Sequence, residues 1–381
     1  MLTLDKVYKA SHVLKEVIRE TDLIKAPKIN KEAEVYLKTE NLQVTGSFKV
    51  RGAYFKISQL SDEEKAKGVI ACSAGNHAQG VALAASRAGI KSLICLPDGA
   101  PISKVEATKS YGAEVCLVEG VYDDAYAKAL QLRDEKGYTF IHPFDDEDVI
   151  AGQGTIGLEI LEQLPEVEQV VVPIGGGGLI SGVAFAIKQL KPSCKVIGVQ
   201  AGVVASMYAS RQAGKVTTVP DAATLADGIH VLTPGSLTFE MCQKYVDEIV
   251  TVSEDEIAAA ILALLEVQKT VAEGAGATPV AACMSGKVDT TKKTVCVVSG
   301  GNVDVTTLSR IITKGLSKTG RITEFTVKIA DKPGSLVQLL QTISKTGANI
   351  LSVNHAREDK HSDIGACVVS MVLETRNRQH V

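Results

Sequence analysis

The stretch Val-Pro-Ile-Gly-Gly-Gly-Gly-Leu at residues 172–179 decides the fold expected of this chain. It follows the apolar residues 170–172 and precedes an apolar, small-residue segment at 180–187, which indicates a strand, a turn and a helix. Four glycines let the backbone approach an anion and aim several N–H groups at it, and a helix N-terminus adds partial positive charge. A tight turn without a ligand is the simpler reading, but four consecutive glycines cost much backbone entropy. The stretch therefore predicts a phosphate-binding turn.

The composition favours small-molecule chemistry. The chain has 381 residues, of which 45% are hydrophobic and 22% charged, as expected of a soluble protein with two or three domains. The net charge is only -3 and the basic residues are scattered, which argues against nucleic-acid and membrane partners. No apolar run reaches the roughly 18 residues that span a bilayer, and the N-terminus lacks a signal-peptide core. We expect a cytoplasmic protein.

The eight cysteines show no Cys-x-x-Cys spacing, and five of them lie in strand-like apolar runs. This pattern is typical of buried, reduced thiols rather than of disulfides or metal ligands. No metal site is predicted.

Short β-rich runs alternate with helical patterns from residue 68 onward, which predicts parallel sheets in two open α/β lobes. The expected strands are 68–72, 92–96, 114–118, 169–172, 195–200 and 294–298, and the expected helices are 78–88, 104–111 and 254–269.

The pattern changes near residues 315–321, where the chain becomes polar and glycine-punctuated. The tail then indicates a strand at 323–329, a helix at 335–346, and strands at 349–356 and 365–373. This is the start of a ferredoxin-like βαββαβ module. We expect the module, residues 321–381, to be incomplete at Val381.

Three further motifs accompany the glycine run, at residues 46–53 (Gly-Ser-Phe-Lys-Val-Arg-Gly-Ala), 73–77 (Ser-Ala-Gly-Asn-His) and 299–302 (Ser-Gly-Gly-Asn). A lysine, small polar turns and a phosphate-binding turn together suggest a cofactor that is a phosphorylated aldehyde, bound to the lysine as a Schiff base. With segments 40–43, 142–145 and 151–155, these motifs resemble the threonine dehydratases, which are fold type II (tryptophan synthase β-like) pyridoxal-phosphate enzymes. The resemblance covers residues 10–315. It implies a catalytic domain at 1–318, with a small lobe at about 46–150 and a large lobe formed by about 1–45 and 151–318.

The resemblance also implies the cofactor-binding residues. Lys49 would bind pyridoxal 5'-phosphate covalently and, once released, act as the base. Phe48 would pack on the cofactor, and Ser299 would hydrogen-bond its pyridine nitrogen. The cofactor phosphate would accept hydrogen bonds from the backbone of Gly175, Gly176, Gly177, Gly178 and Leu179.

The segment Ser73, Ala74, Gly75, Asn76 and His77 would bind the substrate carboxylate at the start of a helix. Ser73 joins Lys49 as an expected catalytic residue, and Asn76 would also hydrogen-bond the cofactor's phenolic oxygen. His77 is expected to be structural rather than an acid or base. Glu273 matches a family carboxylate near the active site.

The tail resembles an ACT domain, a regulatory module that pairs between subunits. Asp331, Pro333, Gly334 and Asn349 are the expected effector-binding residues, for an amino acid or a nucleotide. A homodimer or homotetramer follows from the same resemblance, and a dimerisation arm without a ligand is the alternative.

The expected reaction is removal of water and ammonia from L-threonine, giving 2-oxobutanoate, with L-serine as a second substrate. One methyl group separates the two substrates, and a pocket discriminates on that difference by only about 1 to 3 kcal/mol. Serine racemase is one alternative, but relatives that racemise carry a serine in place of Ala74 and metal-binding carboxylates where this chain has Gln200 and Ser206. A monovalent cation there is left open. The other alternative is a ligand sensor with a vestigial core, against which the intact Lys49 argues.

Overall fold

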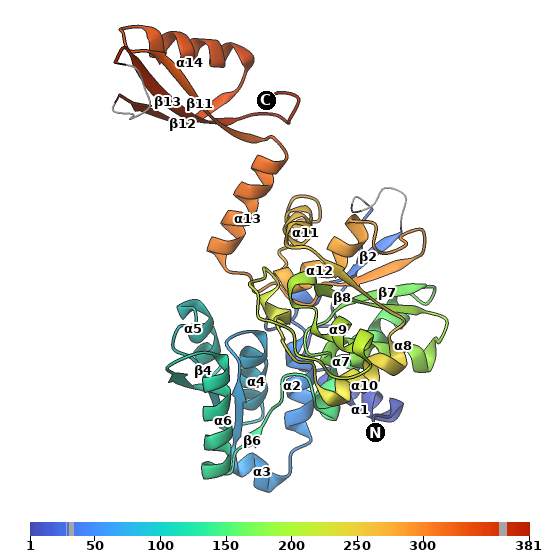
Figure 1. Cartoon of the computed structure of the whole chain (residues 1–381). Helices are drawn as coiled ribbons and strands as arrows, with labels where there is room; N and C mark the ends of the chain where they lie inside the picture. The colour runs from blue at the N-terminus through green and yellow to red at the C-terminus, as the bar shows by residue number, and fades with distance from the viewer. Residues whose placement is uncertain (28, 30–33, 358–363) are drawn as a thin grey trace. The chain divides into compact units, whose positions relative to one another are not determined.

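The computed structural model describes residues 1–27, 29, 34–357 and 364–381. By internal contacts the chain divides into two compact units, Met1–Val303 and Asp304–Val381 (Figure 1). The expected boundary lay at residues 318–321, so the helix α13 (Val305–Lys318) falls on the other side of it. This helix buries only Ile311 and contacts the first strand of the second unit.

The large lobe of the first unit is built on a six-stranded sheet of order β1-β2-β10-β7-β8-β9. All neighbours are parallel except β1 and β2. Every residue of the central strands β7 and β10 is buried, as expected for strands covered on both faces. The strands are β1 (Leu23–Lys25), β2 (Val35–Lys38), β7 (Gln169–Pro173), β8 (Lys195–Ala201), β9 (Glu248–Val252) and β10 (Thr294–Val297).

Helices surround this sheet, and the α7–α8 pair forms much of its core with apolar side chains of β7, β8 and β10. The helices of the lobe are α1 (Leu4–Leu14), η1 (Glu40–Leu42), α7 (Glu147–Gln163), α8 (Gly178–Leu190), η2 (Gly202–Val204), α9 (Ser206–Ala213), η3 (Asp227–Ile229), α10 (Ser236–Tyr245), α11 (Glu254–Glu266) and α12 (Gly274–Met284).

The small lobe has a four-stranded parallel sheet of order β5-β4-β3-β6. Its strands are β3 (Val69–Cys72), β4 (Ser92–Pro97), β5 (Glu114–Val118) and β6 (Thr139–Phe140). Its helices are α2 (Lys49–Ser58), α3 (Asp62–Lys67), α4 (Asn76–Arg87), α5 (Ile102–Ser110) and α6 (Tyr122–Lys136). The predicted alternation of strands and helices is confirmed, with element ends that shift by three residues at most.

The lobes meet where α2 packs against α7. A Cβ built on Gly152 of α7 would lie 2.6 Å from the backbone oxygen of Arg51 and from the Cα of Gly52. The two backbones approach this closely only because both positions are glycine. The packing sets the direction of α2, which begins at Lys49.

The second unit contains a three-stranded antiparallel sheet of order β11-β13-β12 with α14 (Ser335–Thr346) over one face. Its strands are β11 (Ile322–Ala330), β12 (Asn349–Ala356) and β13 (Ala366–Glu374). The core consists of Ile343 of α14 against Val369, Met371 and Leu373 of β13. The predicted βαββ order of elements is confirmed.

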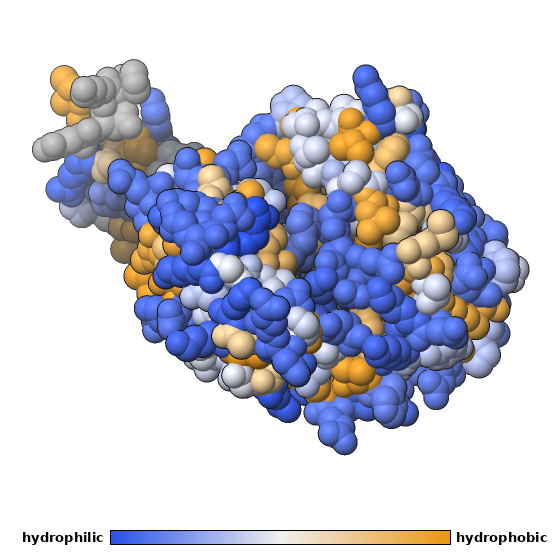
Figure 2. All heavy atoms as spheres, turned by 90° about the horizontal axis from the view of Figure 1, so that it is seen from below, coloured by the Kyte–Doolittle hydropathy of each residue, from blue (hydrophilic) through white to orange (hydrophobic). Residues whose placement is uncertain are grey.

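The surface in Figure 2 is mostly hydrophilic, with small, scattered apolar groups. Within the described residues, no helix is both long and apolar enough to cross a membrane.

Candidate active site

Lys49 is the first residue of α2, and the neighbouring backbone holds it against the motif at 299–302. The N–H of Phe48 donates to the backbone oxygen of Ser299 at 3.1 Å, and Ser47 forms a β-bridge with Gly300. The Nζ of Lys49 donates to the backbone oxygen of Pro143 at 2.8 Å. Two motifs about 250 residues apart thus meet at the lysine.

Burial disfavours the charged form of the Lys49 amine and lowers its pKa to about 8, although the negative charge of Glu273 acts in the opposite direction. An ordinary lysine is almost fully protonated at neutral pH. Only the neutral amine attacks an aldehyde or accepts a proton, so this environment favours the form of Lys49 that is competent as a nucleophile or a base.

The glycine run forms the turn between β7 and α8. Gly177 adopts φ 100°, which disfavours other residues, and the Thr238 hydroxyl donates to the Gly176 backbone oxygen at 2.6 Å. A Cβ on Gly176 or Gly178 would overlap Phe144, the neighbour of the Pro143 that Lys49 contacts. Among the described residues, none accepts a hydrogen bond from the N–H groups of Gly175, Gly176 or Gly177.

The N–H groups of Gly178 and Leu179 also lack partners within α8, because the first turn of a helix leaves its N–H groups unpaired. The turn therefore presents a row of donors at the positive end of a 13-residue helix.

The segment Ser73–His77 joins β3 to α4, which starts at Asn76. The Ser73 hydroxyl accepts a hydrogen bond from the Gly75 N–H at 3.1 Å, and no atom lies within 4 Å of a Cβ built on Gly75. Ala74 packs at the edge of the small-lobe core. The loop thus presents a helix N-terminus toward open space.

His77 is turned away from that space. Its Nε2 lies 2.8 Å from the backbone oxygen of Ile141, and the ring is buried. Burial, and then the nearby Lys49, lower the pKa of His77 to about 3, so the ring is neutral and its Nε2 donates to that oxygen.

Asn76, Glu273 and Asn302 form a hydrogen-bonded chain across the site. The Asn76 Nδ2 donates to the Glu273 Oε1 at 2.7 Å, and the Asn302 Nδ2 donates to the Asn76 Oδ1 at 2.8 Å. Burial, reinforced by the charge of Asp227, raises the pKa of Glu273 to about 7. Asn76 lies in the small lobe and Glu273 in the large lobe, so these hydrogen bonds link the two lobes.

An ion pair also joins the two lobes, next to the hydrogen bonds of Asn76, Glu273 and Asn302. The Lys104 Nζ of α5 lies 2.8 Å from the Asp227 Oδ2 of η3. No role was predicted from the sequence for Lys104, Asp227, Asn302 or Thr238. A role for Asn302 could have been predicted, because it is the last residue of the motif at 299–302. Lys104, Asp227 and Thr238 lie outside the quoted motifs, and no local sequence pattern points to them.

A buried ion cluster supports α2 behind the site. The Arg51 guanidinium donates to both carboxylate oxygens of Glu40, each at 2.8 Å, and also to Glu159, which accepts from the buried Lys38. Burial alone would raise the pKa of Glu40, but Arg51 holds it below its usual value. The segment at 40–43 thus positions the start of α2.

The predicted effector residues do not come together within one chain. Asp331, Pro333 and Gly334 precede α14, whereas Asn349 follows it and donates to the Glu374 Oε2 at 3.1 Å. A 12-residue helix is about 18 Å long, so the two groups lie at opposite ends of the module.

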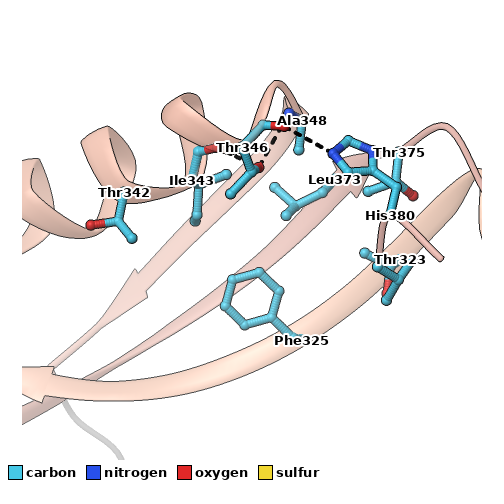
Figure 3. Close-up of a pocket in the computed structure, with 10 residues that line it drawn as sticks. Thr323, Phe325, Thr342, Ile343, Thr346, Ala348, Leu373, Thr375 and His380 are labelled. Carbon is cyan, nitrogen blue, oxygen red and sulfur yellow. Dashed lines mark hydrogen bonds between the residues drawn. The ribbon is translucent and has the colours of Figure 1, made fainter. Parts of the chain in front are cut away.

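A pocket of about 260 Å³ opens at the Asn349 end of α14 (Figure 3). Phe325 lies on the strand below it, and the His380 Nε2 lies 3.0 Å from the Thr346 backbone oxygen at its rim. The lining residues are Thr323, Phe325, Thr342, Ile343, Thr346, Ala348, Leu373, Thr375, His380 and Val381.

The first unit offers what a phosphorylated pyridine aldehyde requires. It has a buried amine with a lowered pKa, unpaired N–H donors for a phosphate, and the buried Ser299, two residues after β10. The model for the family described as "Pyridoxal-phosphate dependent enzyme" matches residues 14–300. The chain belongs to this family. It is therefore an enzyme that uses pyridoxal phosphate.

Relatives agree with this assignment over nearly the whole chain. The L-threonine ammonia-lyase of Thermotoga maritima is 52% identical over 384 residues, which cover 100% of this chain and 96% of the relative. The solved threonine deaminase isoform 2 of Solanum lycopersicum is 38% identical, with a TM-score of 0.77 over 81% of this chain and 93% of its own. Maize serine racemase is 35% identical, with a TM-score of 0.78 over 83% and 98%. The predicted fold type II architecture is confirmed.

Proposed function

We propose that the chain is an L-threonine ammonia-lyase that releases 2-oxobutanoate and ammonia, and that it also accepts L-serine. The observation that carries this function is the buried Lys49 amine, with a pKa lowered to about 8, where the motifs at 46–53 and 299–302 meet. The 52% identity to a relative of that activity over the full chain supports the choice of substrate.

Lys49 holds the cofactor and then moves the proton. Pyridoxal phosphate, when bound, draws off the electron pair that remains on the substrate's Cα after the proton leaves. Burial keeps the Lys49 amine easily deprotonated, so that it accepts the Cα proton at near-neutral pH. Phe48, whose ring centroid lies 5.4 Å from the Nζ of Lys49, forms a wall beside it.

Backbone donors and polar side chains position the reactants. Gly175 to Leu179 hold the phosphate, and the Ser299 hydroxyl donates to the pyridine nitrogen. The loop Ser73–His77 binds the substrate carboxylate at the N-terminus of α4. Asn76 binds the cofactor's phenolic oxygen, and Glu273 and Asn302 fix the orientation of its amide.

Serine racemase is the nearest competing function, and two observations favour the lyase. A racemase needs a proton donor on the opposite face of the substrate, where the Ala74 methyl carries no exchangeable proton. Gln200 and Ser206, at the positions of the racemases' metal ligands, are buried and hydrogen-bonded within the protein. The Gln200 Oε1 accepts from the Tyr208 N–H at 2.8 Å, and the Ser206 hydroxyl donates to the Val231 backbone oxygen at 2.6 Å.

The second unit is a regulatory module in this proposal, and its effector is an amino acid rather than a nucleotide. The pocket of about 260 Å³ is small for a nucleotide, and it combines apolar Phe325 and Leu373 with threonine hydroxyls. The effector-binding residues predicted from the sequence are Asp331, Pro333, Gly334 and Asn349, so the pocket is a second location to test. Because the chain has no tryptophan, Phe325→Trp would introduce a single fluorescent reporter. Its emission should shift with L-isoleucine or L-valine and not with a nucleoside monophosphate.

We also propose a homodimer or homotetramer in the cytoplasm. Exposed Leu351 and Val353 on the edge strand β12 support self-association, and the eight free thiols support a reducing compartment. Sedimentation equilibrium should give two or four chains per particle.

The central experiment is to add L-threonine to the purified, cofactor-loaded chain and measure 2-oxo acid and ammonia. The wild type should release both in equal amounts and form no D-amino acid. Lys49→Ala should lose the visible cofactor band and the turnover, whereas Lys67→Ala, an exposed lysine, should keep both. Turnover by Lys49→Ala, or D-allo-threonine, the product of inversion at Cα, as the main product, would exclude this function.

A further inference from the structure

Three potential metal ligands meet in the second unit, which contains none of the residues assigned above to catalysis. Asp331 follows β11, His355 belongs to β12, and Cys367 belongs to β13. One carboxylate oxygen, one ring nitrogen and the thiol sulfur all lie within 4.8 Å of one another. The His355 Nε2 is already 3.0 Å from the Cys367 Sγ.

The register of the sheet explains this meeting. Ile329 of β11 pairs with Cys367, and His355 of β12 pairs with Val369, two residues beyond Cys367. Cys367 therefore stands diagonally across from His355, on the same face of β13 as Val369. The Asp331 N–H donates to the Gly365 backbone oxygen at 2.9 Å, which holds Asp331 at the same end of the sheet.

We propose that Asp331, His355 and Cys367 bind a transition-metal ion of the zinc type. Thiolate, imidazole and carboxylate are all ligands of Zn²⁺, and the soft sulfur selects against Mg²⁺ and Ca²⁺. Zinc bonds of the usual lengths place tetrahedral ligand atoms about 3.3 to 3.7 Å apart, so small side-chain adjustments suffice here. A fourth position is left for water or another ligand.

Exposure gives the ion a route to the ligands. Asp331 and His355 are exposed, whereas Cys367 is buried, so an ion would enter from solvent and bind last to a protected sulfur. The Cys367 Sγ otherwise contacts the Ile329 backbone oxygen at 3.6 Å, which is at best a weak hydrogen bond.

Arg357 competes for one of the ligands. Its Nε lies 3.2 Å from the Asp331 Oδ1, and its side chain is 70% exposed. An exposed ion pair of this kind is weak, so a divalent cation would displace Arg357 from Asp331. The bound ion would then join the loop that precedes α14 to both neighbouring strands. Metal binding would thus restrict the movement of this loop relative to the sheet of the second unit.

The test uses the full-length, cofactor-loaded protein, freed of metal by a chelator and titrated with Co²⁺ as a spectroscopic probe. The wild type should bind one ion per chain, with tetrahedral d–d bands and a sulfur-to-cobalt charge-transfer band, and Zn²⁺ should displace the Co²⁺. Cys367→Ser should abolish the charge-transfer band, while Cys116→Ser, a half-buried cysteine of the first unit, should retain it.

His355→Gln and Asp331→Asn should each weaken Co²⁺ binding by at least about tenfold, since residues that merely support a ligand contribute that much. Arg357→Gln should strengthen binding, because it removes the competing charge. If wild type binds no Co²⁺, or if Cys367→Ser keeps the charge-transfer band, then His355 and Cys367 are only a hydrogen-bonded pair and the proposal fails. Should Cys367→Ser not fold, the opposite shifts of Asp331→Asn and Arg357→Gln still decide.

Discussion

The Asn76 amide of the small lobe donates to the Glu273 carboxylate of the large lobe at 2.7 Å, although the two residues are 197 positions apart. The Asn76 Oδ1 accepts from Asn302, which fixes the direction in which the amide points. The same contact lies in a buried environment that raises the pKa of Glu273 to about 7. This hydrogen bond thus joins the two lobes and orients Asn76, a predicted cofactor-binding residue. Its acceptor, the Glu273 carboxylate, titrates near neutral pH.

Glu273→Gln should stabilise the cofactor-free chain at alkaline pH. The pKa of Glu273 is raised from 4.5 to about 7, so the unfolded chain loses this proton first and stability falls as the pH rises from about 4.5 to about 7. Above that range the charged carboxylate costs about 3 kcal/mol. Gln avoids this cost and still accepts the Asn76 hydrogen bond. Thermal unfolding should show a higher Tm for the variant at pH 8 and no difference at pH 4; equal Tm values at pH 8 would contradict the burial effect.

The rate at which the cofactor-free chain rebinds pyridoxal phosphate should rise with pH and level off above about pH 8. Only the neutral Lys49 amine attacks the aldehyde, and burial lowers its pKa to about 8. Stopped-flow absorbance across pH 6 to 10 would follow the reaction. A midpoint near the ordinary lysine value of 10.5 would mean that the amine is solvated before the cofactor arrives.

Gly176→Ala should destabilise the chain by about 1 to 3 kcal/mol and weaken cofactor binding, because the added Cβ overlaps the Phe144 ring. Gly99→Ala is the matched control, since a Cβ there meets no atom within 4 Å. Urea unfolding and equilibrium dialysis of pyridoxal phosphate would measure both effects. Equal behaviour of the two variants would show that the turn relaxes freely.

Arg51→Met should cost about 3 to 5 kcal/mol, because it leaves the buried Glu40 carboxylate without its principal counter-charge. Arg51→Met with Glu40→Gln should recover much of that loss, since the uncompensated charge is then gone. Urea unfolding of the single and double variants would measure the coupling. A double variant less stable than Arg51→Met would indicate that shape, rather than charge, determines this cluster.

Ala74→Ser should add slow racemisation of L-serine while elimination continues. The hydroxyl would supply the exchangeable proton that the Ala74 methyl lacks, on the face that racemases use. Chiral chromatography would detect D-serine, and Ala74→Gly, which opens space without a hydroxyl, should form none. If both variants formed D-serine, the added space in the pocket, rather than proton transfer by the hydroxyl introduced in Ala74→Ser, would explain the racemisation.

The secondary structure and the glycine turn between β7 and α8 could be predicted because their signals are local. The glycines at 175–178, the alternation of apolar runs and the helix at 335–346 each depend on residues a few positions apart. The helix α13 was predicted to belong to the catalytic domain, but by internal contacts it belongs to the second unit. The boundary depends on those contacts rather than on the polar composition near residue 318. Asn302 was quoted in its motif, but its partners at Thr45 and Asn76 have no counterpart in local sequence.

The sequence by itself determined the α/β lobes and the strand, turn and helix around the glycine run, because backbone freedom and hydrophobic period are properties of short segments. From residue chemistry it also predicted a phosphate site at that turn and a reactive lysine. Only the tertiary structure decided which groups share a buried space and therefore which ones titrate abnormally. The charge that acts on Lys49 is that of Glu273, which is distant in the sequence, and Glu273 itself is affected by Asp227 and by Asn76 of the other lobe. The same holds for Asp331, His355 and Cys367, which come together only because the sheet register aligns three strands.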